Sequence, residues 1–295
     1  MRRHILCILR LMRPYQWYKN LLVFVPLIFS LNAMNIELYS PCLIAFTSLC
    51  LASSVNYIIN DIKDLERDKL HPEKRMRPLP SGEVKLWEAL ALALALSILS
   101  LIMGWCLGRS FSITLLAFLA LGQLYNFVFR EIPLIDVIII GFNYVLRTVA
   151  GAVAIRVRIS PWLFLGIFLV ALMLSLGKRR AELEVLGDSA IIHRGVYKAY
   201  TKELMDMLLI MISTSVIMTY SMYSIYSPIG DCRLIITVPL VIYIVMRYLY
   251  LVYSKSPIAR SMEKLYKDHP LLSALLLWLL MVLTLLYAIP RGGVC

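Results

Sequence analysis

The chain has 295 residues, 60% of them hydrophobic, with a mean hydropathy of +0.78 and a formal net charge of +12. Long apolar runs recur from one end to the other, which excludes a water-soluble globular protein and predicts an all-α, polytopic membrane protein. The lysines and arginines lie mainly in loops between these runs, so the charge reflects membrane topology and anionic lipid, and we expect no nucleic-acid partner.

Hydropathy predicts about nine transmembrane helices in a single domain over residues 1–295, around a central cavity that opens to the cytoplasmic side. Residues 1–19 mix basic and apolar side chains, and we expect them to form an interfacial amphipathic helix. Functional cytoplasmic loops are expected near residues 60–86, 125–136 and 178–205. The predicted spans are Asn20–Asn35, Tyr39–Ile59, Trp87–Leu107, Phe111–Phe129, Pro133–Ile155, Pro161–Gly177, Asp206–Tyr226, Leu234–Tyr253 and Pro270–Ile289.

The basic residues also predict how the chain is oriented. The two sides of the predicted bundle carry 23 and five lysines and arginines, and two more, Arg147 and Arg247, fall within spans. The positive-inside rule then places the N-terminus in the cytoplasm and the C-terminus outside.

The segment RPYQWYKN, residues 13–20, leads into the first predicted span. Trp17 and Tyr18 are typical of the aromatic belt that anchors helices in the headgroup region. Lys19 and Asn20 lie at the mouth of the span, and they are the better candidates for contact with a phosphate.

A dense block of charge, residues 57–82, separates the second and third predicted spans. Asn60, Asp64 and Asp68 are four residues apart, so a continuing helix places them on one face, with Asp61 nearby. Oxygen ligands at this spacing can hold Mg²⁺, which usually completes its coordination with water and substrate phosphates. The motif therefore predicts a phosphorylated or diphosphorylated substrate.

Basic residues follow this acidic motif at once. Lys74, Arg75 and Arg77 are candidates to bind the same anion. The alternative is a solvated helix end, where Asn or Asp caps the helix and Lys or Arg marks the cytoplasmic side. Four oxygen-bearing side chains in register at a membrane boundary favour a binding site.

The next cytoplasmic turn reads YNFVFREIPLID and contains Tyr125, Asn126 and Arg130 at spacings of four to five residues. These three side chains are candidates to line one face of a site, although Arg130 also fits topology alone. Arg147 lies midway along the following span, where an arginine needs a buried partner, so we expect contact with a lipid phosphate or substrate. Arg247 lies near the cytoplasmic end of its span and is expected to extend to the membrane surface.

The last large cytoplasmic segment begins with the basic run Lys178, Arg179 and Arg180. Such a run usually reflects topology alone. Lys178 and Glu182, however, are four residues apart on a helix and are expected to face the cavity together.

Small residues and cysteines are interpreted as packing residues. Ala150, Gly151 and Ala154 follow Arg147 and allow close approach of another helix. The six cysteines form no CxxC pair, so we expect reduced packing residues and no disulfide or zinc framework.

Together these motifs resemble the UbiA superfamily of intramembrane prenyltransferases. The pattern Asn60-Asp61-x-x-Asp64-x-x-x-Asp68, at the cytoplasmic end of the second of about nine helices, carries a resemblance that covers essentially the whole chain. RPYQWYKN, NDIKDLERDKLHPEKRMRPLPSG, YNFVFREIPLIDV and GKRRAEL resemble its decaprenyl-phosphate phosphoribosyltransferase branch. Ordinary members carry a second Asp-rich motif in place of the basic GKRRAEL. This chain departs from the branch at Asn126 and Arg130, where a serine and a lysine are expected.

The resemblance implies an Mg²⁺-dependent enzyme at the inner membrane of a prokaryote, with its active site facing the cytoplasm. Such an enzyme transfers 5-phosphoribose from phosphoribosyl diphosphate to a polyprenyl phosphate and releases diphosphate. Asn60 and Asp64 are the implied metal ligands, and Asp61, Asp64 and Asp68 the implied catalytic residues. The implied substrate contacts are Lys19, Tyr57, Arg130 and Lys178 for the donor, Lys74, Arg77 and Arg147 for the lipid phosphate or either substrate, and Arg75, Tyr125, Asn126, Arg179 and Glu182 for substrate in general.

Two other functions compete with this one. A UbiA-type enzyme that moves a polyprenyl group from its diphosphate to an aromatic or haem acceptor fits the first motif but lacks the second Asp-rich motif. A transporter or lipid-binding membrane protein is the non-enzyme alternative, and it predicts charged groups on both sides of the membrane. The charges gather on one side, which favours an enzyme.

Overall fold

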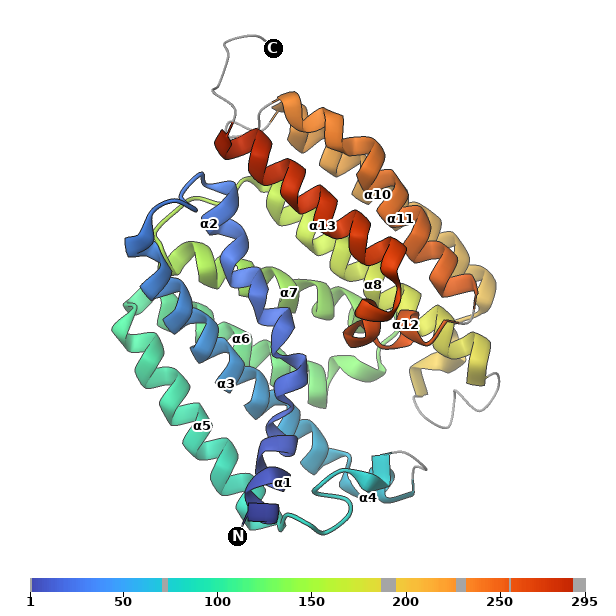
Figure 1. The fold of residues 1–295 in the computed structure, drawn as a ribbon. Helices are drawn as coiled ribbons and strands as arrows, with labels where there is room; N and C mark the ends of the chain where they lie inside the picture. The colour runs from blue at the N-terminus through green and yellow to red at the C-terminus, as the bar shows by residue number, and fades with distance from the viewer. Residues whose placement is uncertain (1, 71–73, 187–194, 227–231, 255, 289–295) are drawn as a thin grey trace. The chain divides into compact units, whose positions relative to one another are not determined.

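The structure is a computed structural model that describes residues 2–70, 74–186, 195–226, 232–254 and 256–288 (Figure 1). Every regular element in these ranges is a helix, which confirms the all-α prediction. The predicted functional loops near residues 60–86 and 178–205 lie partly outside the described residues. The chain divides into two compact units, which are described separately: unit 1 contains residues 1–27, 33–127 and 146–158, and unit 2 contains residues 28–32, 128–145 and 159–295. A single domain over residues 1–295 stays a prediction.

Eight helices in the described residues are long and apolar enough to cross a membrane, against about nine predicted. The difference is the first span, Asn20–Asn35, which is not one long α-helix. It consists of the end of a 3-10 helix, η1 (Pro14–Phe24), and a short α-helix, α2 (Val25–Phe29). The Val25 N–H donates to the carbonyl of Leu22, three residues back. Pro26 has no N–H to donate, so α-helical hydrogen bonding cannot run unbroken through this segment.

Unit 1 is built on α3 (Tyr39–Lys63), which packs against α5 (Leu86–Cys106), α6 (Arg109–Phe127), η1 and the N-terminal helix α1 (Arg2–Met12). α3 and α5 share a buried cluster in which Val55 and Ile58 of α3 lie with the small side chains Ala89 and Ala93 of α5. The remaining elements of this unit are η2 (Ile36–Leu38), α4 (Leu65–Leu70), η3 (Lys74–Met76) and the second half of α7 (Ile135–Ala154).

The N-terminal helix α1 is apolar on two sides. Cys7 and Leu11 are buried in a cluster with residues of α3 and α5. Ile5, Leu6 and Leu9 are 49%, 55% and 45% exposed. The buried side attaches α1 to the bundle, whereas the exposed side has no protein cover in the described residues. Its interfacial location stays a prediction.

The predicted close approach beside Arg147 is confirmed at Gly151 in α7. A Cβ atom at this position would lie 2.0 Å from the carbonyl oxygen of Val23, and Ala150 next to it is fully buried. Only glycine therefore allows this part of α7 to contact the backbone of η1.

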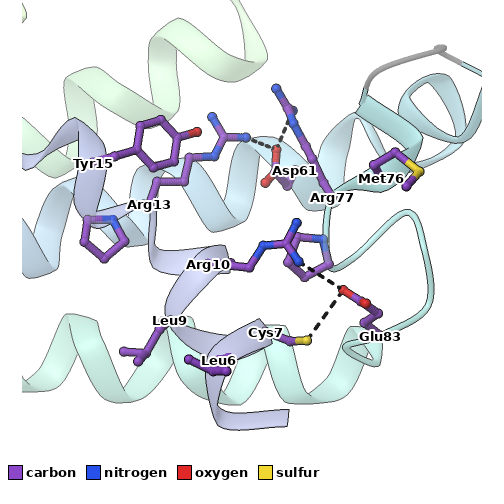
Figure 2. Close-up of a pocket in the computed structure, with 12 residues that line it drawn as sticks. Leu6, Cys7, Leu9, Arg10, Arg13, Tyr15, Asp61, Met76, Arg77 and Glu83 are labelled. Atoms are coloured by element: carbon purple, nitrogen blue, oxygen red, sulfur yellow. Dashed lines mark hydrogen bonds and ion pairs between the residues drawn. The ribbon is translucent and has the colours of Figure 1, made fainter. Parts of the chain in front are cut away.

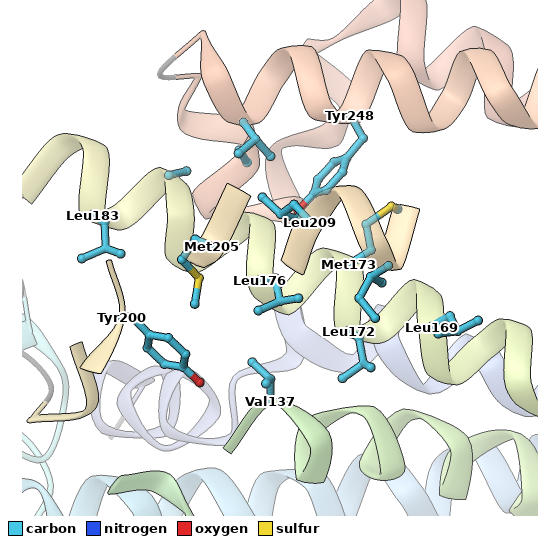
Figure 3. Packing of buried hydrophobic residues seen from close by; sticks show 14 of the residues in the cluster. Val137, Leu169, Leu172, Met173, Leu176, Leu183, Tyr200, Met205, Leu209 and Tyr248 are labelled. Carbon is cyan, nitrogen blue, oxygen red and sulfur yellow. The ribbon is translucent and has the colours of Figure 1, made fainter. Parts of the chain in front are cut away.

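Unit 2 contains α8 (Pro161–Leu186), α10 (Lys202–Tyr226) and α11 (Val238–Tyr253), which pack around a shared hydrophobic cluster (Figure 3). Tyr248 of α11 is buried against Gly177 of α8, where a Cβ atom would lie 2.3 Å from the tyrosine oxygen. The other elements of unit 2 are η4 (Phe129–Glu131), the first half of α7, η6 (Gly195–Ala199), η7 (Cys232–Thr237), α12 (Pro257–Arg260), η8 (Met262–Lys267), α13 (His269–Leu283) and a π-helical end at Thr284–Ala288.

The expectation that all cysteines are reduced is wrong for one of them. Cys232 is disulfide-bonded, whereas Cys7, Cys42, Cys50 and Cys106 are free thiols. The sequence argument failed because spacing along a chain does not show which cysteines approach one another in space.

Candidate functional site

The acidic motif lies where α3 ends and α4 begins. Asp64 is the residue that ends α3, so the motif is not carried by one continuing helix as predicted. Backbone hydrogen bonds nevertheless preserve the four-residue spacing: the Asp64 N–H donates to the Asn60 carbonyl at 3.0 Å, and the Asp68 N–H donates to the Asp64 carbonyl at 2.8 Å. Asp61, Asp64 and Asp68 are all buried, whereas Asn60 is half-buried.

Three basic residues neutralise two of these buried carboxylates. Arg77 Nη1 lies 3.0 Å from Asp61 Oδ1 and 2.8 Å from Asp68 Oδ2, so it joins the two acids. Arg13 Nη2 donates to Asp61 Oδ1 as well, and Lys74 Nζ lies 3.5 Å from Asp68 Oδ1. Buried carboxylates stay ionised only with such partners. The predicted association of Lys74 and Arg77 with the acidic motif is therefore present, and Arg75, by contrast, is exposed.

Arg13 is the residue of this cluster that the sequence argument did not assign to the site. It connects α1 to η1 with φ 54° and ψ 57°, a left-handed conformation that costs a residue with a side chain about 1–3 kcal/mol. Its guanidinium lies over the ring of Tyr57, 5.3 Å from the centroid. Burial is the largest single effect and lowers the pKa of Arg13, but the charge of Asp61, its hydrogen bond with Arg13 and the nearby Tyr15 and Tyr57 together outweigh it, so the pKa is raised. The available signal was its position as the first residue of RPYQWYKN.

A pocket of about 820 Å³ opens beside this cluster, between α1 and the segment that follows η3. Figure 2 shows Arg13 and Arg77 pointing toward Asp61 from two directions, and Arg10 toward Glu83. Leu6, Leu9 and Met76 supply apolar walls. The lining of the pocket therefore combines charged and hydrocarbon side chains.

The acidic motif suits a Mg²⁺ ion that arrives with its phosphate ligand better than a complete protein cage. No group of three or more His, Cys, Asp or Glu side chains with metal-binding geometry occurs in the part of the chain that the structure describes. Asp68 Oδ1 is buried and accepts no hydrogen bond there. Oxygen donors are the ligands that Mg²⁺ prefers, and it is commonly held by one or two carboxylates plus substrate phosphates. The residues therefore fit the ion.

Two predicted substrate contacts on α6 lie in unit 1. Tyr125 is half-buried, and Asn126 is 4% exposed. Asn126 Nδ2 donates to the Asn56 carbonyl at 3.2 Å, and the Asn126 carbonyl accepts from Lys63. Asn126 thus joins α6 to α3, and its predicted contact with substrate remains untested.

Arg147 has the buried partner that an intramembrane arginine needs. Its Nε donates to Asn20 Oδ1 at 2.8 Å, and its guanidinium lies 4.9 Å from the centre of the Phe118 ring. Asn20 is fully buried, and Lys19 beside it is half-buried. Trp17, interpreted from sequence as a headgroup anchor, donates its indole N–H to Ser54 Oγ at 3.1 Å.

Unit 2 holds the remaining predicted residues in a second charged cluster. Arg179 is buried and pairs with Asp136, and Tyr200 donates to Asp136 at 2.8 Å and accepts from the Leu134 N–H at 2.7 Å. Burial, reinforced by Asp136, raises the pKa of Tyr200 to about 12. Sequence reasoning missed the roles of Asp136 and Tyr200, which are far from Arg179 along the chain.

The other basic residues of this cluster are also paired. Arg180 contacts Asp206 at 2.6 Å and Glu184 at 2.8 Å, and Lys202 contacts Glu184 at 3.1 Å. Lys178 Nζ lies 3.9 Å from Glu182 Oε1, and the expectation that both side chains face a cavity stays a prediction. The cluster therefore pairs four basic side chains with four acidic ones: Lys178, Arg179, Arg180 and Lys202 with Asp136, Glu182, Glu184 and Asp206. Arg130, in η4, is 5% exposed and belongs to the same unit.

Arg247 does more than extend to the membrane surface. Its Nε and Nη2 lie 3.2 and 2.8 Å from the two carboxylate oxygens of Asp268, the residue that caps α13. These hydrogen bonds lower the pKa of Asp268 despite its burial. The pair joins α11 to the start of α13 in unit 2.

Comparison with known proteins identifies the family. The model of the UbiA prenyltransferase family matches residues 21–266. The decaprenyl-phosphate phosphoribosyltransferase of Mycolicibacterium smegmatis is 30% identical over 222 residues, which cover 74% of this chain and 70% of that protein. The protein of the same name from Mycobacterium tuberculosis is 29% identical over 221 residues, covering 74% and 73%.

A solved structure shows the same fold. The UbiA homologue of Archaeoglobus fulgidus, bound to GPP and Mg²⁺, superposes with a TM-score of 0.72 at 20% identity, covering 95% of this chain and 99% of the other. The resemblance predicted from the sequence is confirmed. With eight helices able to span a membrane and a family match over most of its length, this chain belongs to the UbiA prenyltransferase family of multi-pass membrane enzymes.

Proposed function

We propose that this enzyme transfers 5-phosphoribose from phosphoribosyl diphosphate to a polyprenyl phosphate of decaprenyl type and releases diphosphate. The two relatives described above are named for a decaprenyl-phosphate phosphoribosyltransferase activity, and each match covers about three quarters of this chain. The proposal also accounts for the basic GKRRAEL segment, which stands where other family members carry a second Asp-rich motif.

The observation that carries the proposal is the buried cluster at the end of α3. Asp61 and Asp68 share Arg77, and Arg13 and Lys74 stand next to them. An incoming diphosphate with its cation offers partners to both kinds of charge, because carboxylates coordinate the cation and guanidinium groups bind phosphate oxygens. A neutral substrate offers a partner to neither kind of charge.

We assign Asn60 and Asp64 to Mg²⁺, with Asp61 and Asp68 as further ligands or as hydrogen-bonding neighbours. When bound, the ion would stabilise negative charge on the departing diphosphate. Asp68 Oδ1 is buried and accepts no hydrogen bond from the described residues, although Lys74 Nζ lies 3.5 Å away, and this supports a place for Asp68 near the ion. Arg77 keeps Asp61 and Asp68 at fixed positions, so these carboxylates need little rearrangement before substrate binds.

The chemical step is a displacement at the anomeric carbon of ribose. An oxygen of the lipid phosphate forms the new bond to this carbon, and the bond to the diphosphate breaks. The attacking oxygen is already ionised near neutral pH, so no residue need act as a strong general base. The protein contributes by aligning two anions that repel each other and by placing basic groups around them.

Substrate contacts follow the sequence-based assignment. Lys19, Tyr57, Arg130 and Lys178 are proposed for the donor, and Lys74, Arg77 and Arg147 for the lipid phosphate or either substrate. Arg75, Tyr125, Asn126, Arg179 and Glu182 complete the proposed set. Burial and ion pairing of Arg179 with Asp136 support an indirect contribution from its side chain.

We place the active site at the cytoplasmic face of a prokaryotic inner membrane, with the N-terminus in the cytoplasm. The distribution of 23 basic residues on one side and five on the other supports this orientation. Phosphoribosyl diphosphate is water-soluble, so it reaches the site from that side.

Transfer of a polyprenyl group from its diphosphate is the second candidate, and the fold likeness to a homologue bound to GPP favours it. That reaction suits a second acidic site for another Mg²⁺. In unit 2, however, Asp136, Glu182, Glu184 and Asp206 each contact a basic side chain. The basic GKRRAEL segment also stands in place of a second Asp-rich motif, and this favours the phosphoribosyl reaction.

The deciding experiment incubates purified protein with Mg²⁺, a polyprenyl monophosphate and radiolabelled phosphoribosyl diphosphate. Label in the organic extract, together with released diphosphate, supports the proposal. Consumption of an allylic diphosphate without lipid labelling supports the second candidate. Asp64→Asn is expected to abolish labelling, whereas Glu66→Gln, at an exposed acid of the neighbouring helix α4, preserves it.

A further inference from the structure

The pocket beside α1 has the composition of a site for an amphiphile. Of its twelve lining residues, seven are apolar or aromatic and five are charged. Its volume, about 820 Å³, lies within the range of about 300–1,000 Å³ that is typical of small-molecule sites. The sequence motifs assigned a role to two of the lining residues, Asp61 and Arg77. Four others, Leu6, Cys7, Leu9 and Arg10, belong to α1.

The charged side of the pocket favours an anion. Arg10, Arg13 and Arg77 face two carboxylates, Asp61 and Glu83, so the lining carries one excess positive charge. Arg13 and Arg77 have side chains only 14% and 30% exposed, and both reach the same oxygen of Asp61. Their guanidinium groups are preorganised at one point, which suits a phosphate with several acceptor oxygens.

The backbone conformation of Arg13 is a second, independent observation that points to a ligand in this pocket. Its left-handed conformation, at φ 54°, is rare for a residue with a side chain, and such conformations cluster at ligand sites. The turn brings the guanidinium between Tyr57 and Asp61 and toward the pocket.

The apolar side of the pocket favours a hydrocarbon tail. Leu6 and Leu9 are 55% and 45% exposed, one turn apart on α1, and Met76 across the pocket is 67% exposed. Leu6 and Leu9 continue the lining along the exposed surface of α1, and Met76 of η3 lines the pocket from the opposite side. A water-soluble sugar diphosphate makes no use of such a surface, whereas a lipid phosphate covers it.

We propose that this pocket binds the phosphate end of the polyprenyl phosphate acceptor, with Arg13 as a phosphate contact and Leu6 and Leu9 as contacts of the first isoprene units. The inference rests on the proposed function, and it adds α1 to the acceptor site. Bilayer phospholipid shares the same chemistry of phosphate and apolar tail, so the test includes it as a competitor.

The test measures binding without turnover. Tritiated farnesyl monophosphate is titrated against the purified full chain in nanodiscs, with no donor present. Leu9→Gln is compared with Ile5→Gln, because both side chains are exposed on α1 and Ile5 does not line the pocket. We expect Leu9→Gln to weaken binding by about fivefold to tenfold, from partial loss of one apolar contact, and Ile5→Gln to leave affinity within about twofold.

Competition identifies the ligand. Unlabelled polyprenyl monophosphate is expected to displace the label, while equal concentrations of inorganic phosphate or phosphatidylglycerol do not. Equal effects of Leu9→Gln and Ile5→Gln, or displacement by either competitor, would overturn the proposal. If Leu9→Gln transfers phosphoribose and binds the polyprenyl phosphate with wild-type affinity, only the pocket assignment is refuted. If the variants bind the lipid phosphate as expected but the wild type transfers no phosphoribose, only the proposed reaction is refuted.

Discussion

Replacing Arg77 by methionine is the most direct test of how the acidic cluster is held together. Methionine keeps much of the aliphatic length of the side chain but removes the group that joins Asp61 to Asp68. Within the described residues, Asp61 keeps Arg13, whereas Asp68 keeps Lys74 at 3.5 Å. The variant should therefore leave Asp68, which is fully buried, poorly compensated.

The expected loss of stability in Arg77→Met follows from the two hydrogen bonds that this variant loses. A hydrogen bond to a charged group contributes about 1.5–3 kcal/mol, so two give an upper bound of about 3–6 kcal/mol. The Arg77 side chain is 30% exposed, and solvent screening reduces this value. We expect the free energy of unfolding to fall by about 2 kcal/mol, which is about a thirtyfold change in the folded-to-unfolded ratio.

Equilibrium unfolding in mixed micelles, followed by circular dichroism, measures this loss. Arg75→Met is the matched control, because Arg75 is exposed in η3, two residues before Arg77, and the change in net charge is identical. Adding Asp68→Asn to Arg77→Met should recover part of the stability, since the poorly compensated charge disappears. If Arg77→Met is as stable as Arg75→Met, the ion pairs do not stabilise the cluster and the reasoning is refuted.

Two further predictions concern other parts of the chain. Gly151→Ala should destabilise the protein by at least about 1–3 kcal/mol, because the new methyl group would meet the Val23 carbonyl. The melting temperature in detergent should fall accordingly. In the control Gly166→Ala, the nearest atom to the new methyl group is 3.9 Å away, so this variant should be neutral or stabilising. Asp268 has a lowered pKa, so the stability from its pairing with Arg247 is present above the ordinary aspartate pKa of about 4 and is lost as pH falls through the lower folded-state value. The stability difference between the wild type and Asp268→Asn, measured by unfolding over a pH series, should therefore be constant at neutral pH and shrink below about pH 4; a constant difference throughout would contradict this assignment.

Local patterns in the sequence predicted the local features of the structure well. Hydropathy located eight spans because a membrane helix needs a continuous apolar run. The spacing of Asn60, Asp64 and Asp68 survived the break in the helix because the four-residue hydrogen bonds persist across it. Pro26, by contrast, interrupted a segment whose hydropathy alone suggested a ninth helix.

Partners distant in sequence could not be predicted in this way. Arg13 meets Asp61, which lies 48 positions away, and Arg179 meets Asp136, 43 positions away. Periodicity describes one helix at a time and carries no information about which helices meet. The basic run at Arg179 therefore suggested free positive charge for a substrate, whereas the structure pairs that residue with a carboxylate.

The backbone at Arg13 has a consequence for protein engineering. Glycine or asparagine adopts the left-handed conformation more easily than arginine, so either residue would relax the turn at position 13. Either would also remove the guanidinium from Asp61 and from the pocket, and the loss of this buried ion pair offsets the relief of backbone strain. A library screened for thermal tolerance should therefore gain little at this position, and a consensus replacement of the strained arginine would remove a pocket residue without a gain in stability.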